Sequence, residues 1–239
     1  MPKTLSALHH LVLGILDIVM PRTCPVCGTT LTMTERHICL TCLAALPRAS
    51  FHLNPYNRIS TQLLPFCADT RAACWLFYSS PSAVSDIVHT LKYKDNPDLA
   101  RYMGARCAEE LADDGFFRAT DIIVPVPMHW FKKLRRHYNQ AYEIAMGISH
   151  VTGLPVADVM KARRHASQAR LTRSQRGYNA VAGIYSVSDR AALRGKRVLV
   201  VDDITTTGAT LRAVAASLRR DCPEIAGIDV LTLGVTENI

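Results

Sequence analysis

The sequence contains little glycine and proline: each occurs only 12 times among 239 residues. This scarcity excludes collagen-like, mucin-like and low-complexity proteins. Hydrophobic residues make up 49% of the chain and charged residues 20%, which is typical of a packed globular protein. The length is sufficient for one α/β domain of ordinary size with a small additional segment.

A long hydrophobic run is also missing. The longest apolar stretch near the N-terminus, residues 11–20, is interrupted by Asp17, whereas a membrane-spanning helix needs about 20 apolar residues. No small-x-small cleavage site follows before Pro21, so a signal peptide is not indicated either. We expect a cytoplasmic protein without a membrane span, whose residues 1–20 form an amphipathic helix. Its apolar face can pack on a partner or on the protein's own core, and we favour the core; the face consists of Leu5, Leu8, Val12, Ile15, Leu16 and Val19.

Acidic residues are scarce in one part of the chain. The net charge is +8, from 28 Lys and Arg against 20 Asp and Glu. The whole excess lies in residues 127–180, which hold ten basic residues and two acids. A local basic surface favours a polyanionic ligand, although a solvated basic face gives the same pattern. The ten residues are Lys132, Lys133, Arg135, Arg136, Lys161, Arg163, Arg164, Arg170, Arg173 and Arg176.

Cysteine, in contrast, is abundant, and four of the eight cysteines form two C-x-x-C pairs, Cys24 with Cys27 and Cys39 with Cys42. Each pair can hold two thiolates on one tight turn, and two such turns supply the four sulfurs that Zn²⁺ prefers. Disulfides in a secreted domain are the alternative, but the lack of a signal peptide favours a reducing compartment. We therefore predict a structural zinc ribbon over residues 21–50. The other four are expected to be ordinary buried thiols: Cys67, Cys74, Cys107 and Cys222.

After the ribbon, strands alternate with helices. Residues 47–70 contain several Pro and Asn without periodicity, which predicts a connecting arm and a domain boundary near residue 50. Apolar strands separated by helices are typical of a doubly wound, mostly parallel sheet covered on both faces, here a single α/β domain over residues 51–239. The predicted strands are residues 73–78, 121–126, 155–160, 182–187, 197–202 and 228–235; the predicted helices are 82–93, 97–112, 139–151 and 209–220.

The most informative segment is residues 198–211, where a buried strand leads into Asp202 and Asp203 and then into a Thr/Gly loop that opens a helix. Ligands of open α/β sheets bind at the carboxyl ends of the strands. The backbone N–H groups at a helix N-terminus suit a phosphate, whereas the two acids suit sugar hydroxyls or the water shell of Mg²⁺. A phosphorylated ribose fits both halves. Its phosphate would be bound by Thr205, Thr206, Thr207, Gly208, Ala209 and Thr210.

This segment resembles the phosphoribosyl pyrophosphate (PRPP) loop of type I phosphoribosyltransferases. Two further stretches narrow the resemblance: residues 124–129, which lead through Arg136 to Tyr138-Asn-Gln-Ala141, and the spaced residues Gln168, Leu171, Arg176, Asn179, Val181 and Gly183. Together with the cysteine ribbon they resemble the ComF family of competence-associated proteins. The resemblance covers nearly the whole chain, from about Pro21 to Val235.

The resemblance implies a type I phosphoribosyltransferase fold, PRPP with Mg²⁺ as the ligand, and an association with DNA uptake. It assigns Lys132 and Arg136 to the pyrophosphate, and Arg176 to a flexible loop over residues 163–179 that closes over the reaction centre. The acid pair, Arg136 and Arg176 would then serve catalysis, the arginines by offsetting charge on the leaving pyrophosphate. The same loop can equally be a plain basic surface.

Two positions depart from the family pattern. Purine-salvage relatives have an Asp, the general base toward the purine, where this chain has Thr206. A Thr cannot carry out that proton transfer at neutral pH, so the sequence argues against purine salvage and leaves the acceptor unidentified. His137-Tyr138 replaces the Gly-Phe that is usual in the family, which keeps an aromatic ring but alters the turn. Tyr93, Trp130 and Tyr138 are candidate surfaces for stacking a base, with simple packing as the alternative.

Three functions are compatible with these features. The first is PRPP binding with phosphoribosyl transfer, and the second is a non-catalytic module that handles single-stranded DNA. The second relies on aromatic residues interleaved with the basic ones, a combination suited to stacking bases: Trp130, Phe131, Tyr138, Tyr142 and Tyr178. The third is a regulatory sensor with PRPP as effector. The candidate partners are accordingly PRPP or another ribose phosphate, single-stranded DNA, competence-machinery proteins and a second copy of the chain.

Overall fold

The computed structural model describes residues 21–128, 136–162 and 184–236. Its contacts divide the chain between Leu46 and Pro47 into two compact units. The first unit holds the four paired cysteines, an antiparallel bridge between Thr23 and Thr30, and helix α2 (Leu40–Ala44). The predicted N-terminal helix, residues 1–20, lies outside the described residues. In the described part of the chain, no helix combines the length and the apolar character needed to cross a membrane.

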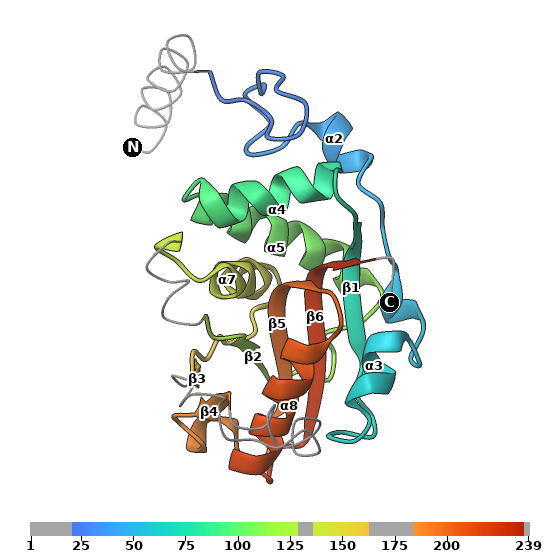
Figure 1. Cartoon of the computed structure of the whole chain (residues 1–239), viewed down its shortest axis with the longest axis vertical. Coiled ribbons are helices and arrows are strands. Elements are labelled where there is room, and N and C mark those ends of the chain that lie inside the picture. The colour runs from blue at the N-terminus through green and yellow to red at the C-terminus, as the bar shows by residue number, and fades with distance from the viewer. Residues whose placement is uncertain (1–20, 129–135, 163–183, 237–239) are drawn as a thin grey trace, which may run out of the picture. The chain divides into compact units, whose positions relative to one another are not determined.

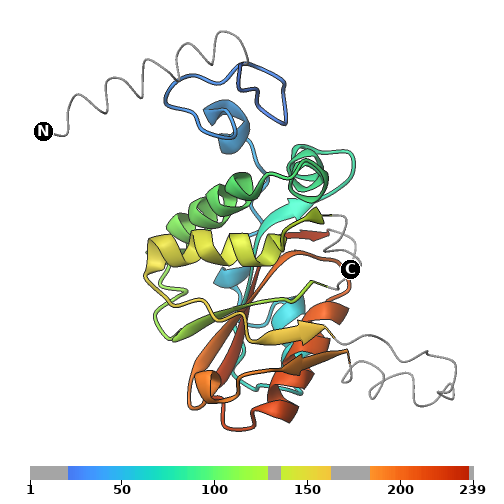
Figure 2. The same cartoon turned by 90° about the vertical axis from the view of Figure 1, so that its left-hand side faces the viewer.

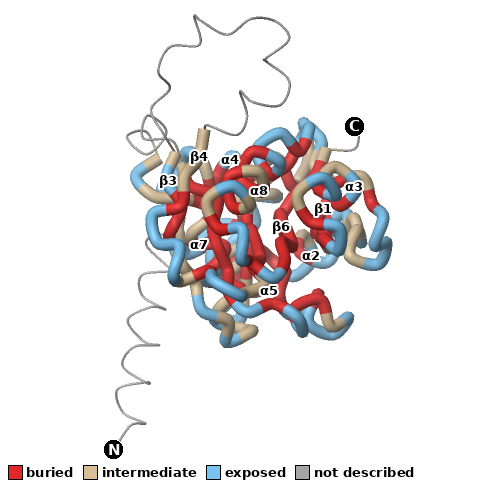
Figure 3. The backbone as a smooth tube through the Cα atoms, turned by 90° about the horizontal axis from the view of Figure 1, so that it is seen from below, coloured by how far each residue is buried: buried red, intermediate tan, exposed pale blue. Residues whose placement is uncertain are grey.

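The second unit is built on a four-stranded sheet in which every pair of neighbouring strands is parallel (Figure 1). The strand order is β1 (Ala72–Tyr78), β6 (Gly227–Thr236), β5 (Arg197–Thr205) and β2 (Ile122–Pro125). The strands are nearly continuous runs of aliphatic residues because both faces of the sheet are covered. Burial follows this pattern, and β6 is buried at every residue except its last (Figure 3). The predicted doubly wound parallel sheet is confirmed.

Helices lie on both sides of the sheet (Figure 2). On one side are α4 (Ala83–Tyr93), α5 (Pro97–Asp113) and α7 (Gln140–Thr152), and on the other are α3 (Arg58–Leu63) and α8 (Ala209–Asp221). The helix starts are set locally, since the side chains of Ser82, Asn96 and Asn139 each accept a backbone N–H from the first turn. The four predicted helices are confirmed to within one residue at each end.

Two glycines allow α5 and α7 to pack in backbone contact. A Cβ atom on Gly104 would lie 2.2 Å from the carbonyl oxygen of Ile144, and one on Gly147 would lie 2.0 Å from the carbonyl oxygen of Arg101. No larger residue fits at either position without moving a helix. The start of α7 lies beside the end of α4, where Tyr138 and Gln140 donate hydrogen bonds to the carbonyl oxygen of Leu91.

The predicted connecting arm over residues 47–70 is wrong, because this segment contains the 3-10 helix η1 (Phe51–Leu53) and α3. Asn57 organises it: its Oδ1 accepts the N–H groups of Ile59 and Ser60, and its Nδ2 donates to three backbone carbonyls. Ile59 and Leu63 are buried in the core. A helix of six residues is too short to show a periodic pattern, which is why the sequence gave no sign of it.

Three strand predictions need correction. Residues 155–159 are not a strand: two backbone hydrogen bonds join Pro155 and Ala157 to Ile123, and the chain then leaves the sheet. Instead, β3 (Met160–Ala162) pairs antiparallel with β4 (Tyr185–Val187), the described end of the segment predicted at 182–187. β4 is followed by the 3-10 helix η3 (Ala191–Leu193). β5 continues to Thr205, three residues beyond the predicted end, because its pairing with β6 extends to Val235.

Candidate functional site

Asp202 and Asp203, the acid pair, lie near the C-terminal end of β5. Asp202 is paired with Thr232 of β6 in the sheet, and the strand continues through Asp203 to Thr205. Each carboxylate accepts the N–H of the following residue, Asp202 from Asp203 at 2.9 Å and Asp203 from Ile204 at 2.7 Å. These short local bonds fix both carboxylates in orientation. Both acids line the same pocket.

Asp202 keeps its proton more readily than an ordinary aspartate. Burial and the neighbouring carboxylate of Asp203 raise the pKa of Asp202 to about 8, while the ammonium of Lys92 acts in the opposite direction. A buried carboxyl next to a like charge keeps its proton more readily. Near neutral pH Asp202 therefore does not carry a full negative charge.

Lys92 is a site residue that the sequence analysis missed. It lies in the last turn of α4, and its Nζ is 3.0 Å from Oδ2 of Asp203, with the two side chains only 22% and 16% exposed. In the sequence, Lys92 resembles any basic residue in the last turn of an amphipathic helix. No local signal relates it to an acid that follows more than a hundred residues later.

The Thr/Gly loop follows β5 directly and leads into α8. Thr205 is buried in the strand, whereas Thr206, Thr207, Ala209 and Thr210 are exposed. Gly208 is the N-cap of α8 with φ +69°, and a Cβ there would lie 2.4 Å from Oε1 of Gln62. The first turn of α8 contains no acidic residue and no side chain caps it. The positive end of this helix is thus open to an anion.

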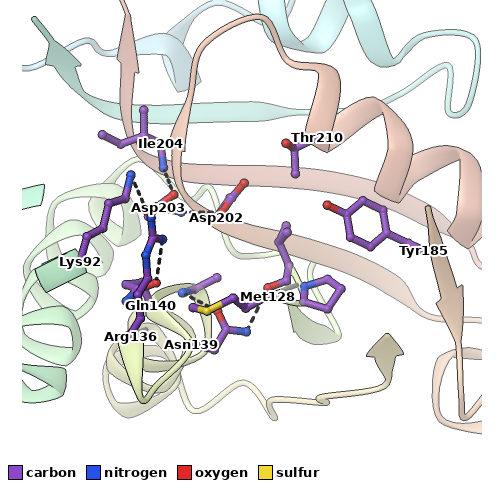
Figure 4. Close-up of a pocket in the computed structure, with 13 residues that line it drawn as sticks. Lys92, Met128, Arg136, Asn139, Gln140, Tyr185, Asp202, Asp203, Ile204 and Thr210 are labelled. Carbon is purple, nitrogen blue, oxygen red and sulfur yellow. Dashed lines mark hydrogen bonds and ion pairs between the residues drawn. The ribbon is translucent and has the colours of Figure 1, made fainter. Parts of the chain in front are cut away.

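The pocket at this edge has a volume of about 230 Å³ (Figure 4). It brings together four predicted site residues, Asp202, Asp203, Arg136 and Thr210. The rest of the Thr/Gly loop lies beside it in the chain but does not line it, and Lys132 and Arg176 lie outside the described residues. Sequence reasoning had not assigned the remaining polar or large side chains on its wall: Lys92, Met128, Asn139, Gln140 and Tyr185.

Arg136 is held at the mouth of this pocket by two weak contacts. Its guanidinium lies 5.8 Å from the ring centre of Tyr93, and its Nη1 donates to Oε1 of Gln140 at 3.4 Å. Next to it His137 has φ +58°, the left-handed conformation that glycine adopts most easily. The altered turn that the sequence predicts at His137-Tyr138 is thus made with His137 in a strained conformation.

Tyr138 is not an exposed stacking surface. Its hydroxyl donates to the carbonyl oxygen of Leu91 at 2.6 Å, and burial raises the pKa of Tyr138 to about 12. Tyr93 is 57% exposed but carries Arg136 on its ring and contacts His89. Trp130, the third candidate, lies outside the described residues.

The four paired cysteines form a separate cluster in the first unit. Their Sγ atoms all lie within 4.8 Å of one another, and those of Cys27 and Cys39 are 3.7 Å apart. Four thiolates at about 2.3 Å from a tetrahedral Zn²⁺ are separated by about 3.8 Å, so the donor set and its spacing fit this metal. Gly28, at φ +73°, turns the first pair, and hydrogen bonds with Thr29 lower the pKa of Cys27 to about 6. The other four cysteines are buried, as predicted.

Residues 92–234 match the family model described as "Phosphoribosyl transferase domain". The chain belongs to the phosphoribosyl transferase domain family. The match spans the site from Lys92 through the acid pair and the Thr/Gly loop.

Among curated proteins, the chain is 30% identical to Competence protein F of Haemophilus influenzae over 102 residues, which are 42% of this chain. The aligned part is 44% of that protein, so the chain spans less than half of the relative it matches. The resemblance to competence-associated proteins is confirmed by this match.

Solved phosphoribosyltransferase-like structures are more distant. Glutamine PRPP amidotransferase from B. subtilis, complexed with ADP and GMP, is 20% identical; the match covers 60% of this chain and 30% of that one, with a TM-score of 0.42. Purine phosphoribosyltransferase from Pyrococcus horikoshii Ot3 is 18% identical; the match covers 61% of this chain and 85% of that one, with a TM-score of 0.35. Similarity at this level identifies neither a substrate nor an activity.

Proposed function

We propose that this protein binds PRPP with Mg²⁺ at the carboxyl edge of the sheet and transfers its phosphoribosyl group to an acceptor. The observation that best supports the proposal is that one pocket is lined by the acid pair, Arg136 and Thr210, beside an uncapped helix N-terminus. An uncapped N-terminus attracts a phosphate, and adjacent carboxylates attract hydroxyls or a divalent ion. Membership of the phosphoribosyl transferase domain family points to the same ligand.

The roles follow from the chemistry of each group. Thr205 to Thr210 would bind the 5-phosphate through backbone N–H groups and hydroxyls, and Asp202 and Asp203 would hold the ribose hydroxyls. The same two carboxylates fit Mg²⁺, which prefers oxygen ligands and keeps several waters. When bound, the ion would supply positive charge to the pyrophosphate. Arg136 would contact the leaving pyrophosphate, and Lys132 and Arg176 stay predictions for the same purpose.

Transfer would break the bond between C1 of the ribose and the pyrophosphate oxygen and form a bond from C1 to the acceptor. Charge builds up on the pyrophosphate in that step, so fixed cations next to it accelerate the reaction. The chain's own contribution is to hold PRPP in position and to offset charge. Thr206 cannot act as a general base, so a proton lost by the acceptor would have to pass to another group. A second hollow of about 360 Å³ adjoins the pocket at Met128 and Asn139 and offers room for an acceptor.

Calorimetric titration of the zinc-loaded protein with PRPP and Mg²⁺ tests the proposal. The wild type should bind, and the Asp202→Asn, Asp203→Asn double variant should bind at least about a hundredfold more weakly, because two charge-assisted contacts are lost. Asp158→Asn is the matched control, since Asp158 lies on the second hollow and should leave the affinity for PRPP unchanged. Equal binding by the wild type and the double variant would contradict this placement of the site.

The single-stranded DNA hypothesis gains no support from the described residues. Most of its basic and aromatic residues lie outside them, and Tyr138 is committed to a hydrogen bond within the protein. It stays a prediction, tested by the salt dependence of binding. A plot of the logarithm of the affinity against the logarithm of the salt concentration should fall with a slope of about 0.7 for each neutralised phosphate.

A further inference from the structure

The backbone next to Lys92, at the end of α4, is held by hydrogen bonds from outside the helix. The carbonyl oxygen of Leu91, its neighbour, accepts hydrogen bonds from the hydroxyl of Tyr138 at 2.6 Å and from Nε2 of Gln140 at 3.2 Å. These bonds tie the last turn of α4 to the start of α7. With the preceding carbonyl held in this way, the side chain of Lys92 extends to the carboxyl edge of β5 (Figure 4).

The ion pair that Lys92 makes lies in the place where a metal ion would be held. Its ammonium is 3.0 Å from Oδ2 of Asp203, so it competes directly with a divalent cation for that oxygen. Both side chains are mostly buried, which reduces the screening of the repulsion between the ammonium and an incoming cation. Free metal should therefore bind poorly while Lys92 stays on Asp203.

The same ammonium lies on the wall of a pocket whose other fixed cation is Arg136. A polyphosphate in this pocket would offer oxygens that a lysine ammonium binds well. The lysine could then leave Asp203, and the metal that accompanies the polyphosphate could take its place.

We propose that Lys92 is a placeholder cation: it neutralises Asp203 before substrate binds, weakens the binding of free divalent metal, and moves to the pyrophosphate when PRPP enters with its metal. The inference rests on the proposed function. By linkage, the metal and PRPP must each strengthen the binding of the other, and Lys92 must contribute to that coupling.

Mn²⁺ binding to the zinc-loaded protein, measured by electron paramagnetic resonance of the free ion, tests the first half. Lys92→Met should bind Mn²⁺ about fivefold more tightly than the wild type, which corresponds to one ion pair of about 1 kcal/mol. Lys94→Met removes the same charge two residues away, from an exposed side chain, and should leave the Mn²⁺ affinity unchanged. Lys92→Gln keeps a polar side chain and should behave as Lys92→Met does.

PRPP affinity, measured by calorimetry at saturating Mn²⁺, tests the second half. Both neutral Lys92 variants should bind PRPP about tenfold more weakly than the wild type, because a charge-assisted hydrogen bond is lost. The placeholder role requires the two affinities to change in opposite directions. If Mn²⁺ binding is unchanged or weaker in both variants, the inference is wrong even where PRPP binds the wild type. If PRPP does not bind the wild type with metal, the proposed function itself fails.

Discussion

Gly208 affects both the backbone conformation and the geometry of the candidate site. Its φ of +69° turns the chain from β5 into α8, and its missing side chain lets Gln62 approach. A phosphate bound at this helix start would need the same free backbone.

Gly208→Ala should destabilise the protein by about 1–2 kcal/mol for the left-handed conformation, and it should also weaken PRPP binding. Gly153→Ala is the matched control, because Gly153 has φ +73° but nothing within 4 Å of an added Cβ. The control should show the same strain in urea unfolding and no change in PRPP affinity. An unaltered PRPP affinity in Gly208→Ala would remove this loop from the phosphate site.

At the scale of elements, the helices on the α5–α7 side of the sheet are positioned by close packing and by one partly buried ion pair. α5 and α7 touch through Gly104 and Gly147, and α5 is tied to β1 and to the segment before it through Glu110. That carboxylate accepts from Arg48 at 2.8 Å twice and from Nε1 of Trp75 at 2.7 Å. Each contact can be tested without touching the pocket.

Gly147→Ala should cost about 1–3 kcal/mol of unfolding free energy, since the new methyl group meets the carbonyl oxygen of Arg101 at 2.0 Å and the helices must separate. Urea unfolding measures the loss. Met146→Ala, at a partly exposed neighbouring position, should stay within about 0.5 kcal/mol of the wild type. A neutral Gly147→Ala would mean that the helices pack less closely than described.

The lowered pKa of Glu110 predicts that the free energy of unfolding depends on pH. Burial acts to raise its pKa, but the hydrogen bonds from Arg48 and Trp75 outweigh burial and hold the pKa of Glu110 below its usual range. A group with a depressed pKa in the folded state contributes stability above its unfolded pKa, and the contribution is lost as the pH falls through the folded value.

Glu110→Gln should therefore be less stable than the wild type near pH 7, and the difference should shrink as the pH falls below the usual carboxyl range near 4.5. Thermal unfolding across that range measures it. Glu109→Gln breaks only the exposed pair with Arg106 and should cost about 0–1 kcal/mol. A Glu110→Gln deficit that is constant with pH would assign the loss to packing instead of charge.

At the scale of the whole molecule, the chain consists of two compact units that are stabilised by different means. The second unit has an extended apolar core across a parallel sheet, whereas residues 21–46, the described part of the first unit, have few buried side chains. A unit so small needs a metal or cross-links to fold, because too little apolar surface is buried to offset the loss of chain entropy.

Cys39→Ser should accordingly release zinc and unfold the first unit while the second unit keeps its cooperative transition. Zinc content by atomic absorption and circular dichroism melting are the two measurements. Cys222→Ser, which changes a buried thiol of the second unit, should keep zinc at full stoichiometry. Full zinc retention in Cys39→Ser would exclude the four-thiolate site.

The sequence by itself determined the features that are encoded locally. Apolar runs alternating with helical segments predicted the parallel strands and the four helices, and the order of strand, acid pair, Thr/Gly loop and helix predicted the ligand edge. Two C-x-x-C pairs predicted a metal cluster. In each case a few consecutive residues carry the whole physical signal.

Tertiary structure decided what depends on residues far apart in the chain. Nothing near Lys92 indicates that it faces Asp203, because the contact exists only once α4 is held to α7 and β5 is placed at the centre of the sheet. The end of β5 at Thr205 was likewise set by its pairing with β6, and α3 was fixed by the hydrogen bonds of Asn57 to distant carbonyls. Hydrogen bonds and charges act over a few ångströms of space, and only the folded chain determines which residues those few ångströms bring together.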